Sequence, residues 1–314
     1  MEQAILQELD RKTLAPLLRA AAAEHFHTEV QNIQCLGGGS FGLAFRAELA
    51  PAPDVPRRVI LKACRCPGMQ ETEAVQLRLL QAHTRVRMPE VYFVGSNFLC
   101  MEFIEGSNAM KPAYVLKSKQ KRQDFAEQTV LGMLDWHAVH NNKFGYLENP
   151  EYDSWQAFYK PLAMEVLEKT KQLVDRGDYK AAHYETMARA GAAFGTIFRE
   201  PVEYASLIHG DLNVMNIMVD PKSLNVTGFI DPFNSLWADR EYDLFQLRNM
   251  TGDRFRLYQT YKEHTRVTEL CDLKCAYYAV VNEALCYLRS GQKWGILFAM
   301  LDKRLRKELR KYGL

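Results

Sequence analysis

The chain has 314 residues, of which 47% are hydrophobic, and a formal net charge of +2 at pH 7. This length and composition can bury one large core or two modest ones, whereas the charge is too small to predict a nucleic-acid or membrane partner. No apolar run approaches the ~20 residues of a membrane-spanning helix, and residues 1–10 lack the basic-then-apolar order of a signal peptide.

The cysteines argue for a reducing environment. There are seven, an odd number, and none forms a Cys-x-x-Cys pair. This usage argues against a disulfide framework or a zinc site, because both need paired or regularly spaced cysteines. We therefore expect a soluble protein of the cytoplasm.

A glycine-rich stretch follows the first helical and strand-like segments. Residues 3–24 predict a helix, residues 30–36 a strand, and Gly37, Gly39 and Gly42 then make a Gly-x-Gly-x-x-Gly pattern. Such a pattern can be a dinucleotide-binding turn, a phosphate-covering hairpin or a plain flexible turn. The next residues, 43–49, are followed by several prolines and suit a strand better than the helix that a dinucleotide fold needs. We therefore expect a hairpin whose backbone N–H groups at Ser40 and Phe41 approach phosphate oxygens.

The next strand carries a lysine. Residues 58–63 are apolar apart from Arg58 and Lys62, and a helix pattern runs from about 69 to 82 with Glu71 and Glu73 on it. A strand lysine is usually solvent-facing, but one that pairs with a helix glutamate can hold the α- and β-phosphates of a nucleotide. Glu71 and Glu73 are both possible partners and lie on different helix faces.

Two strands, 91–94 and 98–101, come next, and Gly106 then marks a hinge between two parts of the chain. Beyond it the pattern is helical, with segments over 122–141, two within 150–198, and 254–264, 268–289 and 293–312. His137 and His140 receive no chemical role. The aromatic start of the 150–198 region is core in the plain interpretation and part of a substrate pocket in the alternative one.

The block from His209 to Asp243 carries the strongest functional signal. Asp211 lies five residues before Asn216, which is the spacing of the kinase catalytic loop, where the aspartate accepts a proton from an attacking hydroxyl and the asparagine binds a metal ion. A hairpin over 217–219 and 226–230 brings Asp231 back beside this loop. Asn216 and Asp231 could then share Mg²⁺, which takes the rest of its shell from phosphates and water. Each residue alone could simply cap a turn, but the complete spacing favours function.

These motifs resemble the aminoglycoside phosphotransferase-like kinases, a superfamily that includes choline and fructosamine kinases and shares a two-lobed fold with protein kinases. The resemblance depends on His209-Gly210-Asp211, Asn216, Asp231 and the Asp239 and Asp243 spacing. It implies an α+β fold with a small antiparallel sheet lobe, residues 1–105, and a mainly helical lobe, residues 106–314.

The resemblance also implies a set of roles. Asp211 is the expected catalytic base, Asn216 and Asp231 the metal ligands, and Asp243 a buried acceptor that supports the catalytic loop. ATP and Mg²⁺ are the expected cofactors, and Glu73 is favoured over Glu71 as the partner of Lys62. The backbone between Met101 and Ile104, through Glu102 and Phe103, is expected to bind the adenine edge, although such contacts do not distinguish ATP from GTP.

The expected acceptor is a small-molecule hydroxyl, as in a sugar, amino alcohol, glycated amine or aminoglycoside-like compound. Gly210 replaces the arginine of regulated protein kinases, and only eleven residues separate Asp231 from Asp243, which leaves little length for docking a peptide. Candidates for orienting the acceptor are Asp239, Glu241 and Glu283, and the alternative for each is a plain surface or structural carboxylate. The alternative functions are a non-catalytic nucleotide-binding scaffold and a protein kinase, and the oligomeric state is left open.

Overall fold

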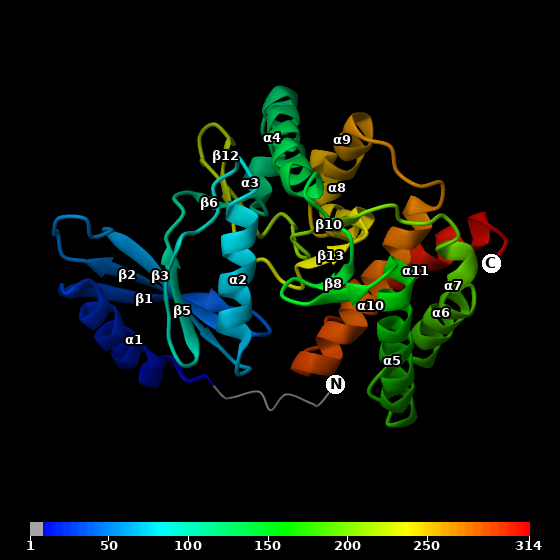
Figure 1. Cartoon of the computed structure of the whole chain (residues 1–314), viewed down its shortest axis with the longest axis horizontal. Coiled ribbons are helices and arrows are strands. Elements are labelled where there is room, and N and C mark those ends of the chain that lie inside the picture. Colours follow the sequence, from blue (N-terminus) through cyan, green and yellow to red (C-terminus); the bar gives the residue numbers. More distant parts are fainter. Residues whose placement is uncertain (1–8) are drawn as a thin grey trace.

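The N-terminal part of the chain forms a five-stranded antiparallel sheet with helices α1 and α2 beside it (Figure 1). The structure is a computed structural model that describes residues 9–314. The strand order is β1-β2-β3-β5-β4. The elements are α1 (Arg11–Phe26), β1 (Val30–Gly38), β2 (Gly42–Leu49), β3 (Arg58–Cys64), α2 (Met69–Gln81), β4 (Val91–Val94) and β5 (Phe98–Glu102).

The first helix is shorter in the described residues than the predicted 3–24. Asp10 is its N-cap, and the Asp10 carboxylate accepts a hydrogen bond from the Thr13 N–H at 2.9 Å, so α1 begins at Arg11. It ends where His27 adopts a left-handed conformation. Residues 3–8 of the predicted helix, and most of the segment compared with a signal peptide, lie outside the described residues.

Alternation along β3 decides which side chains meet each helix. Val59, Leu61 and Ala63 are buried in a hydrophobic cluster with Leu14 and Leu18 of α1. Because successive strand residues point to opposite faces, Ile60 and Lys62 lie on the other face, which α2 covers. The strand alternation thus turns Lys62 toward the interior of the molecule.

The chain leaves the sheet through Gly106. Its φ of +119° and a position where a Cβ would lie 2.4 Å from the Val219 carbonyl oxygen both require glycine. The chain then forms β6 (Ser107–Asn108), which pairs with β11 (Ile217–Val219), itself paired with β12 (Val226–Phe229). This three-stranded sheet joins the exit from the N-terminal sheet to the hairpin predicted over 217–230.

The remainder of the chain is mainly helical (Figure 1). Its helices are α3 (Pro112–Val115), α4 (Lys119–His137), α5 (Trp155–Asp175), α6 (Ala181–Ala192), α7 (Phe194–Ile197), η1 (Arg240–Arg248), α8 (Gly252–Phe255), α9 (Leu257–His264), α10 (Cys271–Ser290) and α11 (Gly295–Lys311). This arrangement of a small antiparallel sheet lobe and a helical lobe confirms the predicted fold class.

A second five-stranded sheet was not predicted. It has the order β7-β10-β13-β8-β9 and consists of strands of two or three residues, β7 (His140–Asn141), β8 (Phe144–Tyr146), β9 (Pro150–Tyr152), β10 (Ala205–Leu207) and β13 (Leu236–Ala238). Strands this short carry too little alternation to be recognised in a sequence. Because β7 takes residues 140–141, helix α4 ends at His137 rather than at the predicted 141.

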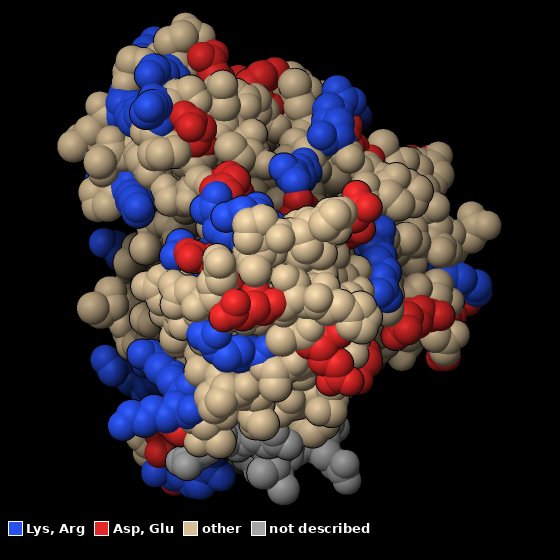
Figure 2. Space-filling model, turned by 90° about the vertical axis from the view of Figure 1, so that its left-hand side faces the viewer, with Lys and Arg blue, Asp and Glu red and all other residues tan. Residues whose placement is uncertain are grey.

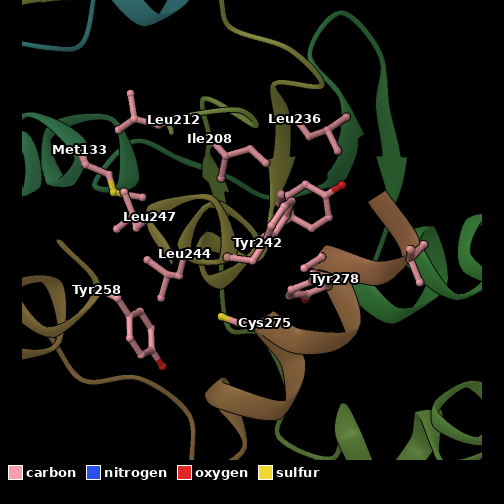
Figure 3. Packing of buried hydrophobic residues seen from close by; sticks show 14 of the residues in the cluster. Met133, Ile208, Leu212, Leu236, Tyr242, Leu244, Leu247, Tyr258, Cys275 and Tyr278 are labelled. Atoms are coloured by element: carbon pink, nitrogen blue, oxygen red, sulfur yellow. The ribbon is translucent and has the colours of Figure 1, made fainter. Parts of the chain in front are cut away.

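A continuous hydrophobic core anchors the segment that contains Asp211. Ile208 and Leu212, on either side of it, are fully buried in the same cluster as Met133 and Leu244 (Figure 3). Tyr242 of η1 and the α10 residues Cys275 and Tyr278 belong to the same cluster. Burial of two flanking side chains fixes the ends of the loop and leaves its polar residues for chemistry.

Figure 2 shows both basic and acidic side chains on this side of the molecule, with basic ones more frequent along the lower left edge. Among residues 9–314, no helix combines the length and apolar character required to cross a bilayer.

Candidate active site

Lys62 lies in a buried ion pair with Glu73. The Lys62 Nζ atom is 2.7 Å from the Glu73 Oε2 atom and also contacts the Asp231 carboxylate. Burial lowers the pKa of Lys62, but the charges of Asp231 and Glu73 outweigh it and raise that pKa, so the ammonium stays protonated. Burial raises the pKa of Glu73, and the charge of Lys62 opposes the rise. Glu71 is exposed on another face of α2, so the structure places Glu73 rather than Glu71 beside the lysine.

Asp211 is held between two asparagines. Asn213 Nδ2 donates to Asp211 Oδ1 at 3.0 Å, and Asn216 Nδ2 donates to Asp211 Oδ2 at 3.0 Å and to the Asp211 carbonyl at 2.8 Å. Burial, and next the charge of Asp231, raise the pKa of Asp211 to about 8, against the two asparagine hydrogen bonds. The two asparagine hydrogen bonds fix the direction of the carboxylate. Its raised pKa makes the carboxylate a stronger proton acceptor than an exposed aspartate.

Sequence reasoning missed Asn213. It lies two residues after Asp211, and its Oδ1 atom accepts from the Met215 N–H at 2.9 Å, so it both caps the turn and aims the carboxylate. The Asp-x-Asn spacing was a usable signal, because asparagine side chains commonly bond to the backbone two residues away.

Asp243 supports the loop that contains Asp211 by accepting hydrogen bonds from its backbone. Its carboxylate accepts from the backbone N–H groups of His209, at 2.9 Å, and Gly210, at 2.6 Å, and from the indole N–H of Trp136 at 3.3 Å. His137 Nε2 lies 3.2 Å away. Burial raises the pKa of Asp243, but the His137 hydrogen bond and the other donors outweigh it and lower that pKa, so the carboxylate is ionised. The two backbone contacts make Asp243 the buried acceptor that the resemblance implied. Its contacts with Trp136 and His137 were not predicted.

His209 is neutral and buried. The Asp211 N–H donates to its Nδ1 atom at 3.3 Å, and burial lowers the pKa of His209 to about 4. The acceptor role of Nδ1 requires the tautomer with the proton on Nε2. The imidazole therefore helps to set the backbone direction at Asp211.

Asp231 and Asn216 present oxygens that suit a hard cation. The Ile230 N–H donates to the Asn216 carbonyl at 3.0 Å, which brings the end of β12 against the loop. Asp231 adopts a left-handed φ of +58°, and its side chain is 46% exposed. Asn216 directs its amide nitrogen at Asp211, so its amide oxygen points away from that carboxylate.

These two oxygen donors suit Mg²⁺ only if other ligands complete its coordination shell. Among the described residues, no group of three or more His, Cys, Asp or Glu side chains is arranged to hold a metal ion. A cation held by one carboxylate and one amide needs phosphate oxygens and water to complete its shell. The donor set therefore fits a metal ion that arrives with a nucleotide.

The glycine-rich loop between β1 and β2 touches the helical lobe. The Phe41 ring stacks on Phe233 with a centroid distance of 4.9 Å, and the Ser40 hydroxyl donates to Gln292 Oε1 at 3.0 Å. A Cβ at Gly42 would lie 2.6 Å from the Ala63 carbonyl oxygen, so the tight approach of the hairpin to β3 needs glycine there. Gly37 has a φ of +136°, and the Gly39 N–H bonds to the Gly42 carbonyl at 3.2 Å.

The segment proposed for the adenine edge is divided by its hydrogen bonds. Met101 is paired within the sheet, and the Glu102 N–H already donates to the Glu90 carbonyl at 2.8 Å. The Glu102 side chain binds Arg87. No described residue accepts from the N–H of Phe103 or Ile104, so these two retain a free backbone donor.

Two of the acceptor-orienting candidates are placed as structural carboxylates, the alternative role that the sequence left open. Asp239 and Glu241 are buried around Lys274, whose Nζ atom lies 2.5 Å from the former and 2.8 Å from the latter. The Tyr278 hydroxyl also donates to Asp239, and Thr268 donates to Glu241. The carboxylates serve to neutralise a buried ammonium, which sequence spacing alone could not reveal. Glu283 of α10 stays half-buried, and burial raises its pKa to about 7.

Comparison with known proteins agrees with this geometry. Residues 13–281 match the family model described as fructosamine kinase. The uncharacterised protein YcbJ of Escherichia coli (strain K12) is 24% identical over 200 residues, which cover 61% of this chain and 66% of YcbJ. The chain thus spans slightly under two thirds of that relative.

Solved structures share the fold. A candidate fructosamine-3-kinase of Thermobifida fusca superposes with a TM-score of 0.65 at 20% identity and covers 93% of this chain and 98% of its own. The complex of APH(2")-IIia with GDP and kanamycin gives a TM-score of 0.64 at 15% identity, with 93% and 98% coverage. Over the 93% of this chain that these alignments cover, its architecture is therefore that of these proteins.

Proposed function

Because the chain belongs to the fructosamine kinase family, we propose that it transfers the γ-phosphoryl group of ATP to a hydroxyl group of a small molecule, with Mg²⁺. The family assignment confirms the predicted resemblance and supports small-molecule phosphotransferase activity. The observation that carries the proposal is the placement of Asp211 between Asn213 and Asn216, next to a hairpin that ends in Asp231.

The nucleotide lies between the two lobes in this proposal. Lys62, held by Glu73, binds the α- and β-phosphates, and the glycine-rich loop from Gly37 to Gly42 covers them. The adenine edge is bound by the backbone between Met101 and Ile104, and the free N–H groups favour Phe103 and Ile104 as donors. Asn216 and Asp231 hold Mg²⁺, which neutralises phosphate charge when bound.

Asp211 acts as the base. The acceptor oxygen bonds to the γ-phosphorus, the bond to the bridging oxygen of the β-phosphate breaks, ADP leaves, and the acceptor proton passes to Asp211. Burial raises the pKa of Asp211, so its ionised carboxylate is a stronger base than that of an exposed aspartate. Asn213 and Asn216 keep the carboxylate aimed during this step.

A small acceptor, rather than a protein, is supported by the catalytic loop. A Cβ at Gly210 would lie 2.1 Å from the Phe233 carbonyl oxygen, so no arginine can stand there to grip a phosphorylated segment. Only eleven residues lie between Asp231 and Asp243. The family description favours a glycated amine among the acceptor classes considered, and Glu283 remains a candidate for orienting it. The seven free cysteines suit the reducing cytoplasm.

The test is an ATP-consumption screen with Mg²⁺ against pooled glycated amines, sugars, amino alcohols and aminoglycosides. The wild type and Asp211→Ala are compared, with nucleotide binding measured in parallel. We expect one pool to stimulate the wild type alone while both proteins bind nucleotide equally. Nucleotide binding without transfer to any pool would instead favour a non-catalytic scaffold, and equal loss of binding and turnover in Asp211→Ala would contradict its role as base.

A further inference from the structure

Two arginines at the junction of the lobes have no carboxylate partner. Arg65 directly follows β3, and Arg289 lies in the last turn of α10. No Asp or Glu among residues 9–314 forms an ion pair with either guanidinium. The Arg65 Nε atom is buried and has no hydrogen-bond partner among residues 9–314. Half-buried guanidinium groups without a counter-charge are costly unless a ligand supplies one.

The contacts of the glycine-rich loop bring the two arginines to one place. The Arg65 N–H donates to the Phe41 carbonyl at 2.9 Å, and Phe41 stacks on Phe233. Arg289 Nη1 donates to the side-chain oxygen of Asn234, the next residue, at 3.2 Å. In Figure 1 the tips of β1 and β2 point toward the lower end of α10, in keeping with the Ser40 bond to Gln292.

The thiol of Cys66 gives a second indication of their proximity. Burial raises the pKa of Cys66, and the positive charges of Arg289 and Arg65 both oppose that rise. One thiol thus lies within the field of a guanidinium from each lobe.

This place adjoins the catalytic loop. A Cβ at Gly210 would lie 2.7 Å from the Asn234 carbonyl carbon, so Asn234 packs directly against the residue before Asp211. Because the Asn234 oxygen accepts from Arg289, its Nδ2 group points elsewhere, and Nδ2 is buried without a partner among the described residues. A donor that lacks an acceptor therefore belongs to the same side chain that contacts the Arg289 guanidinium.

We propose that Arg65 and Arg289, with the Asn234 amide, bind an anionic group of the acceptor, a carboxylate or a phosphate, while its hydroxyl faces Asp211. The proposal deepens the phosphotransferase function and rests on it. Guanidinium groups bind such anions through two parallel hydrogen bonds, which gives orientation as well as affinity. The acceptor is then a hydroxyl compound with a negative charge at its far end, and a polycationic acceptor is disfavoured.

Matched acceptors test the charge requirement. The fructose conjugates of glycine, aminomethylphosphonate and methylamine carry a carboxylate, a phosphonate and no anion at the same distance from the sugar. We expect the anionic conjugate of the correct type to have a kcat/KM at least about tenfold above that of the methylamine conjugate, mainly through KM. Equal values for all three would overturn the proposal, and the ranking of the two anions identifies which one the site takes.

Variants assign the effect to the arginines. Arg65→Gln and Arg289→Gln should each raise KM for the anionic conjugate at least about tenfold and leave KM for the methylamine conjugate and for ATP within about twofold. Arg254→Gln is the control, since Arg254 is exposed on α8 and forms no ion pair with a described residue. A rise in KM for ATP instead would assign the arginines to the nucleotide and contradict the proposal.

Direct binding separates this proposal from the catalytic one. The same conjugates are titrated by calorimetry into protein saturated with Mg²⁺ and a non-hydrolysable ATP analogue. Tighter binding of an anionic conjugate that both arginine variants abolish, in a protein without turnover, would defeat the phosphotransferase function and leave the anion site standing. The absence of any charge-dependent binding would overturn the anion site whatever the turnover.

Discussion

Glu73 of helix α2 forms an ion pair with Lys62 of strand β3. The Glu73 Oε2 atom lies 2.7 Å from the Lys62 Nζ atom, and both side chains are largely buried. The partner of Lys62 is therefore set by helix geometry, because residues two apart on α2 point to different faces.

Glu73→Gln should lower kcat/KM for ATP about 10- to 100-fold, since it removes a charge-assisted hydrogen bond of about 1.5–3 kcal/mol that positions Lys62. Steady-state kinetics with varied ATP measure the effect. Glu71→Gln is the matched control on the exposed face of α2 and should remain within about twofold of the wild type. A larger loss in Glu71→Gln than in Glu73→Gln would contradict the pairing.

Asp231→Ala should weaken nucleotide binding in a metal-dependent manner. With Mg²⁺ present we expect Kd for ATP to rise at least about tenfold, because the variant lacks the carboxylate placed beside Asn216, which corresponds to about 1.4 kcal/mol. Without Mg²⁺ the Kd should change little. Calorimetric titrations with and without the metal give both numbers, and Asp220→Asn at the turn of the same hairpin is the control. An equal loss in both conditions would show that Asp231 does not act through a cation.

The buried His209 should make the protein less stable in mild acid. Its pKa is lowered to about 4 in the folded protein, against about 6.5 in an unfolded chain. The unfolded state then binds more protons between these values, so this contribution is complete above about pH 6.5 and is lost as the pH falls toward 4. We expect about 2 kcal/mol of unfolding free energy to be lost between pH 7 and pH 5.

Urea unfolding of wild type and His209→Gln at the two pH values isolates that contribution. Glutamine can still accept from the Asp211 N–H but does not titrate. The variant should lose about 2 kcal/mol less than the wild type over this range. The same pH dependence in both proteins would assign the acid sensitivity to other groups.

Glu241→Gln should affect stability rather than substrate binding. The carboxylate is one of two that neutralise the buried Lys274, so its loss should lower the free energy of unfolding by about 1–3 kcal/mol. KM for the acceptor should stay within about twofold, because Glu241 is enclosed by Thr268 and Lys274. Glu151→Gln, at an exposed site, is the control for both measurements. A selective rise in acceptor KM would return Glu241 to the substrate site.

The parts of the site that the sequence predicted are those whose geometry is local. Asp211 and Asn216 share one loop, and Asp231 returns on a short hairpin, so spacing along the chain determines their separation. Lys62 and Glu73 also belong to consecutive elements. The sheet and most helices were predictable for the same reason, since each has its own periodicity.

The other parts depend on contacts between distant segments. Asp243 meets Trp136 across 107 residues, and Lys274 meets Asp239 across 35, which no local pattern encodes. The proposed pairing of Arg65 with Arg289 likewise depends on contacts of the glycine-rich loop with the helical lobe. The choice between the two roles of Asp239 and Glu241 stayed open for the same reason, because a sequence does not distinguish a carboxylate that faces a ligand from one that faces a buried lysine.

The division of the hydrophobic core has a spectroscopic consequence. The cluster between α1 and the outer face of the sheet, which includes Leu18, Phe45 and Leu61, is separate from the large cluster that runs from α2 through the helical lobe. All four tryptophans of the chain lie beyond residue 130. Unfolding of α1 and the sheet would therefore leave tryptophan emission unchanged, whereas circular dichroism would record the lost secondary structure. The two signals together would show whether the N-terminal lobe unfolds before the helical lobe.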